Sequence, residues 1–212
     1  MIDIHAAMAQ LAKSRPLFHS EADFQLALAW KLREDHPQLA IRLEYRPAKL
    51  TQRGYIDVWA ADGQEVVAIE LKYKTRSLQA TANGEVFDLL DQSAQDIGRY
   101  DTLKDIQRLE QVVAAVPNSA GFVLLLTNDR SYWTASSRQD TVDAHFRLHE
   151  GRLLTGQLSW GDAASAGTRH TRESHLLLAG SYELKWRDYS TIRSGAYGTF
   201  RYVLVSVARR EA

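Results

Sequence analysis

The first regular pattern of apolar and polar positions along the chain has the period of a helix. Ser20 stands before it as an N-cap, and Asp23 follows three residues later in a variant of the capping box. The apolar positions then share one wide face, and the pattern stops near His36-Pro37. These positions are Phe24, Leu28, Trp30 and Leu32. We therefore predict a helix from Ser20 to about His36.

The period then changes to that of β-strands. Residues 41–46 alternate between apolar and charged, which predicts a half-buried strand. Two more β-rich runs cover residues 55–60 and 65–74, and the Asp62-Gly63 pair between them is a strong hairpin signal. Residues 66–69 are continuously apolar, so the strand that contains them is predicted to be central and covered on both faces.

The second half of the chain combines one long helical pattern with β-rich segments. Residues 86–116 have helical spacing, and residues 122–126 form an apolar run typical of a buried strand. Beyond them we predict a hairpin over residues 146–158 and further strands over 175–179 and 200–207.

This order of elements predicts an α/β fold in which helices flank a mixed sheet, with a β-rich C-terminal extension. A chain of 212 residues, 45% of them hydrophobic, suits one domain with a core of its own. We predict a single domain over residues 1–212, with its core at about 20–130 and the extension at about 140–212.

Composition excludes several classes of protein. The chain has no cysteine, which rules out disulfides and thiolate-bound metals. It has no leader-like N-terminus and no apolar run long enough for a membrane span, so we expect a cytoplasmic protein without a membrane partner. The formal net charge of zero argues against a protein held on nucleic acid by its overall charge. A basic patch beside an acidic metal site would also sum to zero.

Three residues on the predicted 55–74 hairpin point to one site. With Asp62-Gly63 as the two turn residues, Asp57 faces Ala68 on the neighbouring strand. Glu70 lies two positions further on, hence on the same face as Asp57 and diagonal to it. Lys72 lies on that face as well, because side chains repeat every two residues in a strand.

Two carboxylates at this spacing can hold one Mg²⁺, with Mn²⁺ as a substitute, and such an ion polarises a phosphodiester and acidifies a bound water. Lys72 would orient or deprotonate that water, or stabilise charge on the phosphate. The carbonyl of Leu71 lies between the two side chains and is a third candidate metal ligand. The alternative is a solvated strand face with a weak ion pair between Glu70 and Lys72. The apolar run that ends at this pair, and Asp57 on the neighbouring strand, favour a site.

Ile56-Asp57, followed after twelve residues by Glu70-Leu71-Lys72, resembles the PD-(D/E)XK, or restriction-endonuclease-like, nuclease superfamily. The superfamily order of helix, three antiparallel strands, helix and strand is similar to the order predicted from Ser20 to Thr127. The resemblance implies that Asp57 and the Glu of Glu70-Leu71-Lys72 bind metal and that the Lys is catalytic. It also implies that Glu21 is an accessory ligand, although a first-turn Glu favours the helix dipole in any case. Isoleucine stands where the superfamily name has proline, and the Gln-x-x-x-Tyr spacing of the exonuclease branch is absent.

Basic residues near this motif are candidates for phosphate contacts, although each is also typical of an ordinary protein surface. They are Arg53, Lys74, Arg76 and Arg99. The C-terminal part interleaves aromatic residues with arginines, as base-stacking surfaces do, and also as strands that pack into a core do. That segment comprises Trp186, Arg187, Tyr189, Arg193, Tyr197, Arg201 and Tyr202.

We expect metal-dependent hydrolysis of phosphodiester bonds, in DNA more than in RNA. The alternative is a nucleic-acid-binding or scaffold protein that uses the same fold without cutting. The neutral net charge and the missing Gln-x-x-x-Tyr spacing favour that alternative, whereas the three intact site residues argue against it. No phosphate-binding P-loop and no serine-hydrolase motif is present. A homodimer would suit an enzyme that cuts both strands of a duplex.

Overall fold

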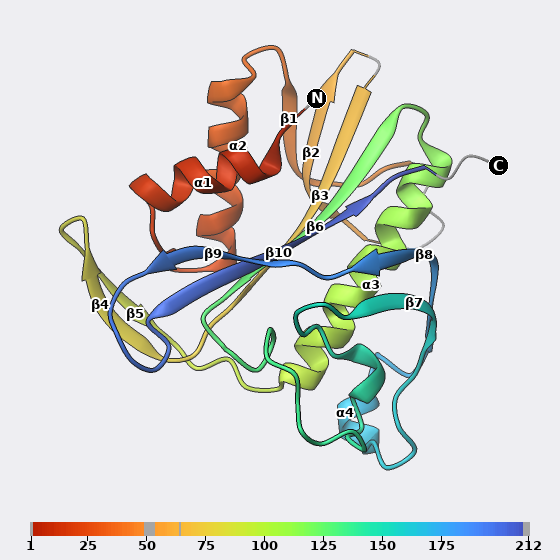
Figure 1. Cartoon of the computed structure of the whole chain (residues 1–212). Coiled ribbons are helices and arrows are strands. Elements are labelled where there is room, and N and C mark those ends of the chain that lie inside the picture. The colour runs from red at the N-terminus through yellow and green to blue at the C-terminus, as the bar shows by residue number, and fades with distance from the viewer. Residues whose placement is uncertain (1, 49–53, 64, 210–212) are drawn as a thin grey trace.

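The computed structural model describes residues 2–48, 54–63 and 65–209. It is a mixed α/β fold built on a central six-stranded sheet (Figure 1). In chain order the elements are α1 (Ile4–Ser14), α2 (Glu21–Asp35), β1 (Ala40–Tyr45), β2 (Ile56–Asp62), β3 (Glu65–Lys74), β4 (Leu78–Ala82), β5 (Glu85–Leu89), α3 (Gln95–Ala115), β6 (Ser119–Thr127), the 3₁₀-helix η1 (Ala144–Phe146), β7 (Leu153–Leu158), α4 (Ala166–Arg169), β8 (Leu176–Glu183), β9 (Trp186–Thr191) and β10 (Thr199–Val207).

The strand order in the central sheet is β1-β2-β3-β6-β10-β9. Only β3 and β6 pair in parallel; the other neighbours are antiparallel. Helix α3 connects the parallel pair, which needs such a crossover. The prediction that β3 is a central strand is therefore confirmed.

The sheet separates two apolar cores. On one face, α1 and α2 pack against Val58, Ile69 and Leu71. On the other, α3 and segments of the C-terminal half pack against Trp59 and Ala68. The start of α2 is confirmed, because the Ser20 side chain accepts a hydrogen bond from the Asp23 N–H. Helix α1 lies outside the predicted elements.

The predicted helix over residues 86–116 is wrong in its first part. Residues 85–89 form β5, which pairs with β4 in a hairpin that projects from one side of the molecule (Figure 1). Asn83 and Gly84 are its two turn residues, and both have positive φ, at 52° and 79°. An Asn-Gly pair strongly favours a two-residue turn. Residues 85–89 therefore form a strand, although their apolar residues have helical spacing.

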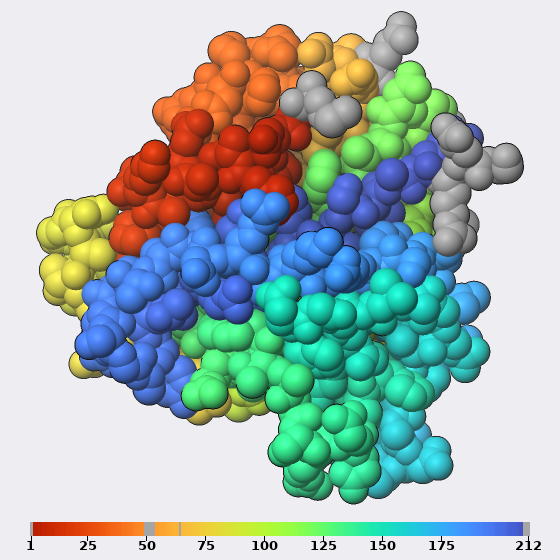
Figure 2. Space-filling view, viewed as in Figure 1, coloured from red at the N-terminus to blue at the C-terminus, as the bar shows by residue number. Residues whose placement is uncertain are grey.

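The C-terminal half differs from its prediction in pairing. Residues 146–158 do not form a hairpin, since β7 pairs with the distant β8. The predicted strand over 200–207 is β10, which pairs with β6 and carries β9 on its other edge. Figure 2 shows blue atoms of the C-terminal segment between the red N-terminal atoms and the blue-green atoms of the middle of the chain. In the part of the chain that the structure describes, no helix is long and apolar enough to cross a bilayer.

Candidate active site

The pairing of β2 with β3 decides where Asp57 lies. Asp62 pairs with Glu65, and Gly63, which follows Asp62, has the positive φ of 56° that a tight turn requires. The predicted pairing of Asp57 with Ala68 is therefore wrong by two residues, because Trp59 takes that place. A shift of two residues keeps every side chain on its face. Continued by one pair beyond Val58 and Ile69, the register sets Asp57 directly opposite Glu70.

Asp57 is held through both its side chain and its backbone. Its Oδ2 accepts a hydrogen bond of 2.5 Å from the N–H of Leu71, and its carbonyl accepts one of 2.7 Å from Nε2 of Gln25 on α2. Burial raises the pKa of Asp57 to about 6, against the opposing effects of the Leu71 bond and the Lys72 charge. The second carboxylate oxygen of Asp57, Oδ1, makes no hydrogen bond to the described residues.

Glu70 is almost fully buried, with 1% of its surface exposed. Its carboxylate contacts the guanidinium of Arg108, which reaches it from α3. Burial and the charge of Asp105 raise the pKa of Glu70 to about 9, and Arg108 only partly offsets them. An ionised Glu70 is therefore costly here without a further positive charge.

Lys72 lies on the same face of the sheet and has two oxygen partners. Its Nζ is 2.6 Å from a carboxylate oxygen of Asp105 and donates to the carbonyl of Leu71 at 3.1 Å. Burial lowers the pKa of Lys72, but the charges of Asp105, Glu21 and Asp57 raise it by more, so the net shift is upward. Lys72 is thus a protonated ammonium at neutral pH.

Glu21 is the first residue of α2 and reaches the end of β3. Its Oε2 accepts a hydrogen bond of 2.7 Å from the N–H of Tyr73, the residue after Lys72. Its charge acts on both Lys72 and Asp57. All four side chains predicted for the catalytic centre therefore belong to one electrostatic cluster.

Two members of this cluster were not predicted, Asp105 and Arg108 on α3. Arg108 bridges Glu70 to Asp105, with 2.9 Å to the latter, and Asp105 is only 3% exposed. A signal for Asp105 existed in the sequence. It falls at helical spacing within a stripe of small and apolar residues, and a charged residue in a buried stripe needs a partner. The stripe comprises Gly98, Thr102, Asp105, Leu109 and Val112.

Negative charge exceeds positive charge in this cluster. The acids Glu21, Asp57, Glu70 and Asp105 stand against the cations Lys72 and Arg108, which leaves two negative charges uncompensated when all are ionised. Within the described ranges, no three or more His, Asp or Glu side chains are grouped as metal ligands. Magnesium, however, keeps several waters and often uses only one or two carboxylates. The opposed pair of Asp57 and Glu70 fits such an ion.

The residues predicted to contact phosphate have different environments in the structure. Lys74 is half-buried at the end of β3. Arg76 pairs with Asp91 at 2.8 Å. Arg99 is 4% exposed and bonded to Asp143, so it cannot contribute to an exposed rim, and its prediction is corrected. Arg53 lies outside the described residues.

Comparison of the chain with models of protein families, with curated proteins and with solved structures gave no match. A functional assignment therefore rests on the geometry and charge of the site itself. In these terms the site is a buried, acid-rich cluster with one protonated lysine, spread over two antiparallel strands and two helices.

Proposed function

We propose that this protein is a metal-dependent nuclease of the PD-(D/E)XK type, which hydrolyses phosphodiester bonds, in DNA above all. The observation that carries the proposal is the facing pair of the half-buried Asp57 and the buried Glu70, in a cluster whose acids outnumber its cations by two. The order of α2, β1 to β3, α3 and a strand parallel to β3 supports a restriction-endonuclease-like arrangement.

In this function Asp57 and Glu70 hold the metal together with the carbonyl of Leu71, and Glu21 assists through its charge. A metal ion held there would lower the pKa of a bound water and polarise the phosphate. The raised pKa of Lys72 favours one of its two possible roles: it stays protonated, so it stabilises negative charge on the phosphate rather than removing a proton. Asp105 keeps the Lys72 ammonium in position.

The proposal is tested by incubating the protein, with Mg²⁺ or Mn²⁺, with linear, circular, single-stranded and branched DNA and with RNA. We expect cleavage that stops in EDTA and in Asp57→Ala and Lys72→Ala. Lys13→Ala is the matched control, because Lys13 is an exposed lysine on α1. Wild-type rates in Lys72→Ala, or no cleavage of any substrate together with no metal binding, would contradict the proposal and favour a non-cutting scaffold.

Metal affinity provides a second test, through Arg108. This guanidinium contacts the Glu70 carboxylate and so competes with a metal ion for it. We expect Arg108→Ala to bind Mn²⁺ on the order of tenfold more tightly in calorimetry, and to be less stable than wild type in EDTA because Glu70 loses its partner. The control is Arg42→Ala, which removes an exposed arginine from β1. Unchanged or weaker Mn²⁺ binding in Arg108→Ala would argue against a metal at Glu70.

A further inference from the structure

A cavity lies outside the acidic cluster, between the end of β6 and the loop that joins β9 to β10. Its volume is about 540 Å³, within the range of pockets that bind small ligands. Both cationic and aromatic side chains line it, in a part of the chain that the carboxylate cluster does not use. The lining residues are Asn128, Arg130, Trp133, Gly195, Ala196, Tyr197, Thr199 and Arg201.

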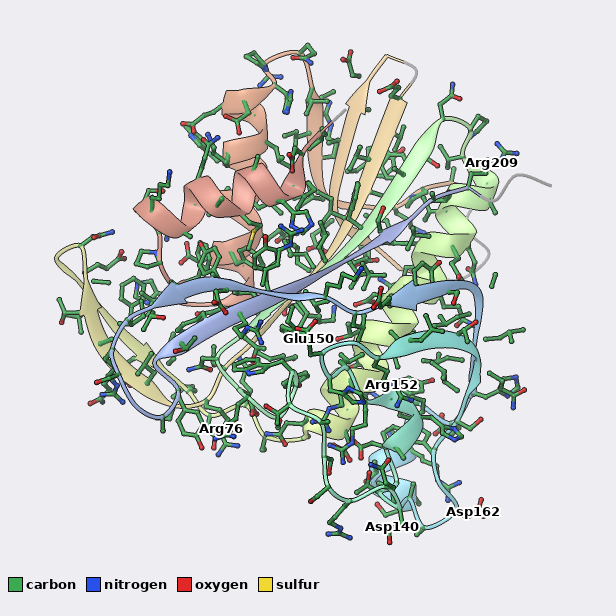
Figure 3. All side chains as sticks on the ribbon, viewed as in Figure 1. Arg76, Asp140, Glu150, Arg152, Asp162 and Arg209 are labelled. Atoms are coloured by element: carbon green, nitrogen blue, oxygen red, sulfur yellow. The ribbon has the colours of Figure 1, made fainter. Side chains whose placement is uncertain are left out.

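Asn128 fixes one wall of this cavity. Its Oδ1 accepts a hydrogen bond of 2.7 Å from the N–H of Arg76, and its Nδ2 donates to the Arg76 carbonyl at 3.1 Å. The same Nδ2 donates to the carbonyl of Tyr197 at 2.9 Å. One amide thus joins the chain beyond β3 to the β9–β10 loop, and Figure 3 shows Arg76 near that loop.

Tyr197 is held in a costly conformation. Its φ is +63°, in the left-handed region that a bulky side chain rarely adopts. The loop around it is closed by a hydrogen bond of 2.8 Å from the N–H of Ile192 to the carbonyl of Gly198. The Arg76 guanidinium lies 5.0 Å from the centre of the Tyr197 ring. Strain of this kind concentrates where a side chain must be presented to a ligand.

The lining also includes an aromatic ring and two arginines, Trp133, Arg130 and Arg201. Arg201 lies 5.9 Å from the ring centre of Trp133 and is anchored by Asp188 at 2.8 Å. Arg130 is exposed at the cavity, and its guanidinium makes no hydrogen bond or ion pair to the described residues. A positive charge is therefore available to an incoming anion.

The cavity shares a face of the sheet with the acidic cluster. Arg201 lies two residues before Val203, which packs in the core on the α3 side, so Arg201 lies on that face of the sheet. Glu70 lies two residues after Ala68 of the same core, and Lys72 two residues after Glu70, so both lie on that face as well. Leu125, the strand partner of Lys72, is three residues before Asn128, which corresponds to about 10 Å along β6. A nucleic-acid strand bound at the cluster can therefore extend past Lys74 toward the cavity.

We propose that this cavity binds a nucleotide of a single-stranded nucleic acid, with its base against Tyr197 or Trp133 and its phosphate at Arg130. The inference deepens the proposed nuclease function and rests on it, because that function identifies the nucleic acid bound here as the substrate. Aromatic faces beside arginines are the means by which proteins bind unpaired bases. Bases in a duplex are stacked on one another, so the substrate class is single-stranded or locally opened DNA or RNA.

The test measures affinity without catalysis. Fluorescence anisotropy in EDTA follows the binding of labelled single-stranded and duplex oligonucleotides of equal length. We expect the wild type to prefer the single strand, and Tyr197→Ala and Trp133→Leu each to weaken its binding, on the order of 5- to 100-fold. Trp30→Leu is the matched control, because Trp30 is 65% exposed on α2, on the opposite face of the sheet.

A third variant covers the case in which removal of an aromatic ring impairs folding. Arg130→Gln alters an exposed side chain that makes no hydrogen bond or ion pair to the described residues, and we expect it to weaken single-strand binding and to flatten its salt dependence. Wild-type affinity in Arg130→Gln and in the folded aromatic variants would overturn the inference, as would a wild type without preference for single strands. Because EDTA prevents cleavage, single-strand binding through this cavity in a protein that cuts nothing would overturn the nuclease proposal alone.

Discussion

At the scale of single residues, Asp57 and Glu70 link the site to stability. Burial raises both pKa values, to about 6 and about 9, above the usual values of about 3.9 and 4.3. Between about pH 4 and pH 9, the folded protein therefore holds protons that the unfolded chain has already released. By linkage, folding is favoured most at low pH as far as these two groups are concerned, and that contribution is lost as pH rises through 6 toward 9.

We accordingly expect the melting temperature of the metal-free protein to fall between pH 5.5 and 9. Glu70→Gln should flatten this dependence, because its neutral amide cannot ionise. Mn²⁺ should raise the melting temperature more at pH 8 than at pH 6, since a metal replaces the protons. Thermal unfolding in EDTA and in Mn²⁺ checks this, and the same pH profile in Glu70→Gln as in wild type would contradict it.

At the scale of elements, helix α2 positions Glu21 at the site, and the stability of this helix depends on its N-cap residue, Ser20. The Ser20 hydroxyl accepts a hydrogen bond from the N–H of Asp23, which would otherwise lack a partner at the start of the helix. We expect Ser20→Ala to lower the free energy of unfolding by about 1 kcal/mol in urea titrations. Ser20→Asp should retain most of that stability, because aspartate caps equally well. Equal losses in the two variants would show that the cap is not the cause.

Elements were predictable from the sequence where one local signal dominated. The Asp62-Gly63 pair predicted the β2–β3 hairpin. Asp57 and Glu70 still share a face, because the observed register differs from the predicted one by two residues, an even number. Asn83-Gly84 was an equally local signal, but the apolar residues after it were assigned to a helix. The predictions failed where distant segments meet, as in the pairing of β7 with β8.

The candidate site shows the same division. Asp57, Glu70 and Lys72 come from a short motif on one hairpin, and Glu21 from the first turn of a helix. Arg108 could not be found in this way, because only the crossover between β3 and β6 brings α3 over Glu70, 38 residues away in the chain. Local patterns contain no information about which turn of a helix will face which strand.

At the scale of the whole molecule, the C-terminal half completes the sheet. Strand β10 pairs with β6 along most of its length, so removal of β10 would leave a central apolar strand as an open edge. We expect a chain that ends at Asp140 to aggregate or to lack cooperative unfolding, as judged by size-exclusion chromatography and circular dichroism. A stable, monomeric 1–140 fragment would instead show that these residues fold without the C-terminal half.

Helix α1 contacts two strands that lie far from it in the sequence, β9 and β10. The Tyr189 hydroxyl donates to the Arg15 carbonyl at 2.6 Å, and His5 bonds to the Tyr202 hydroxyl at 2.9 Å, across 197 residues of sequence. During synthesis on the ribosome, α1 emerges long before the strands that complete its packing. The nascent chain therefore carries uncovered apolar surface until β9 and β10 emerge, and chaperones bind surfaces of this kind.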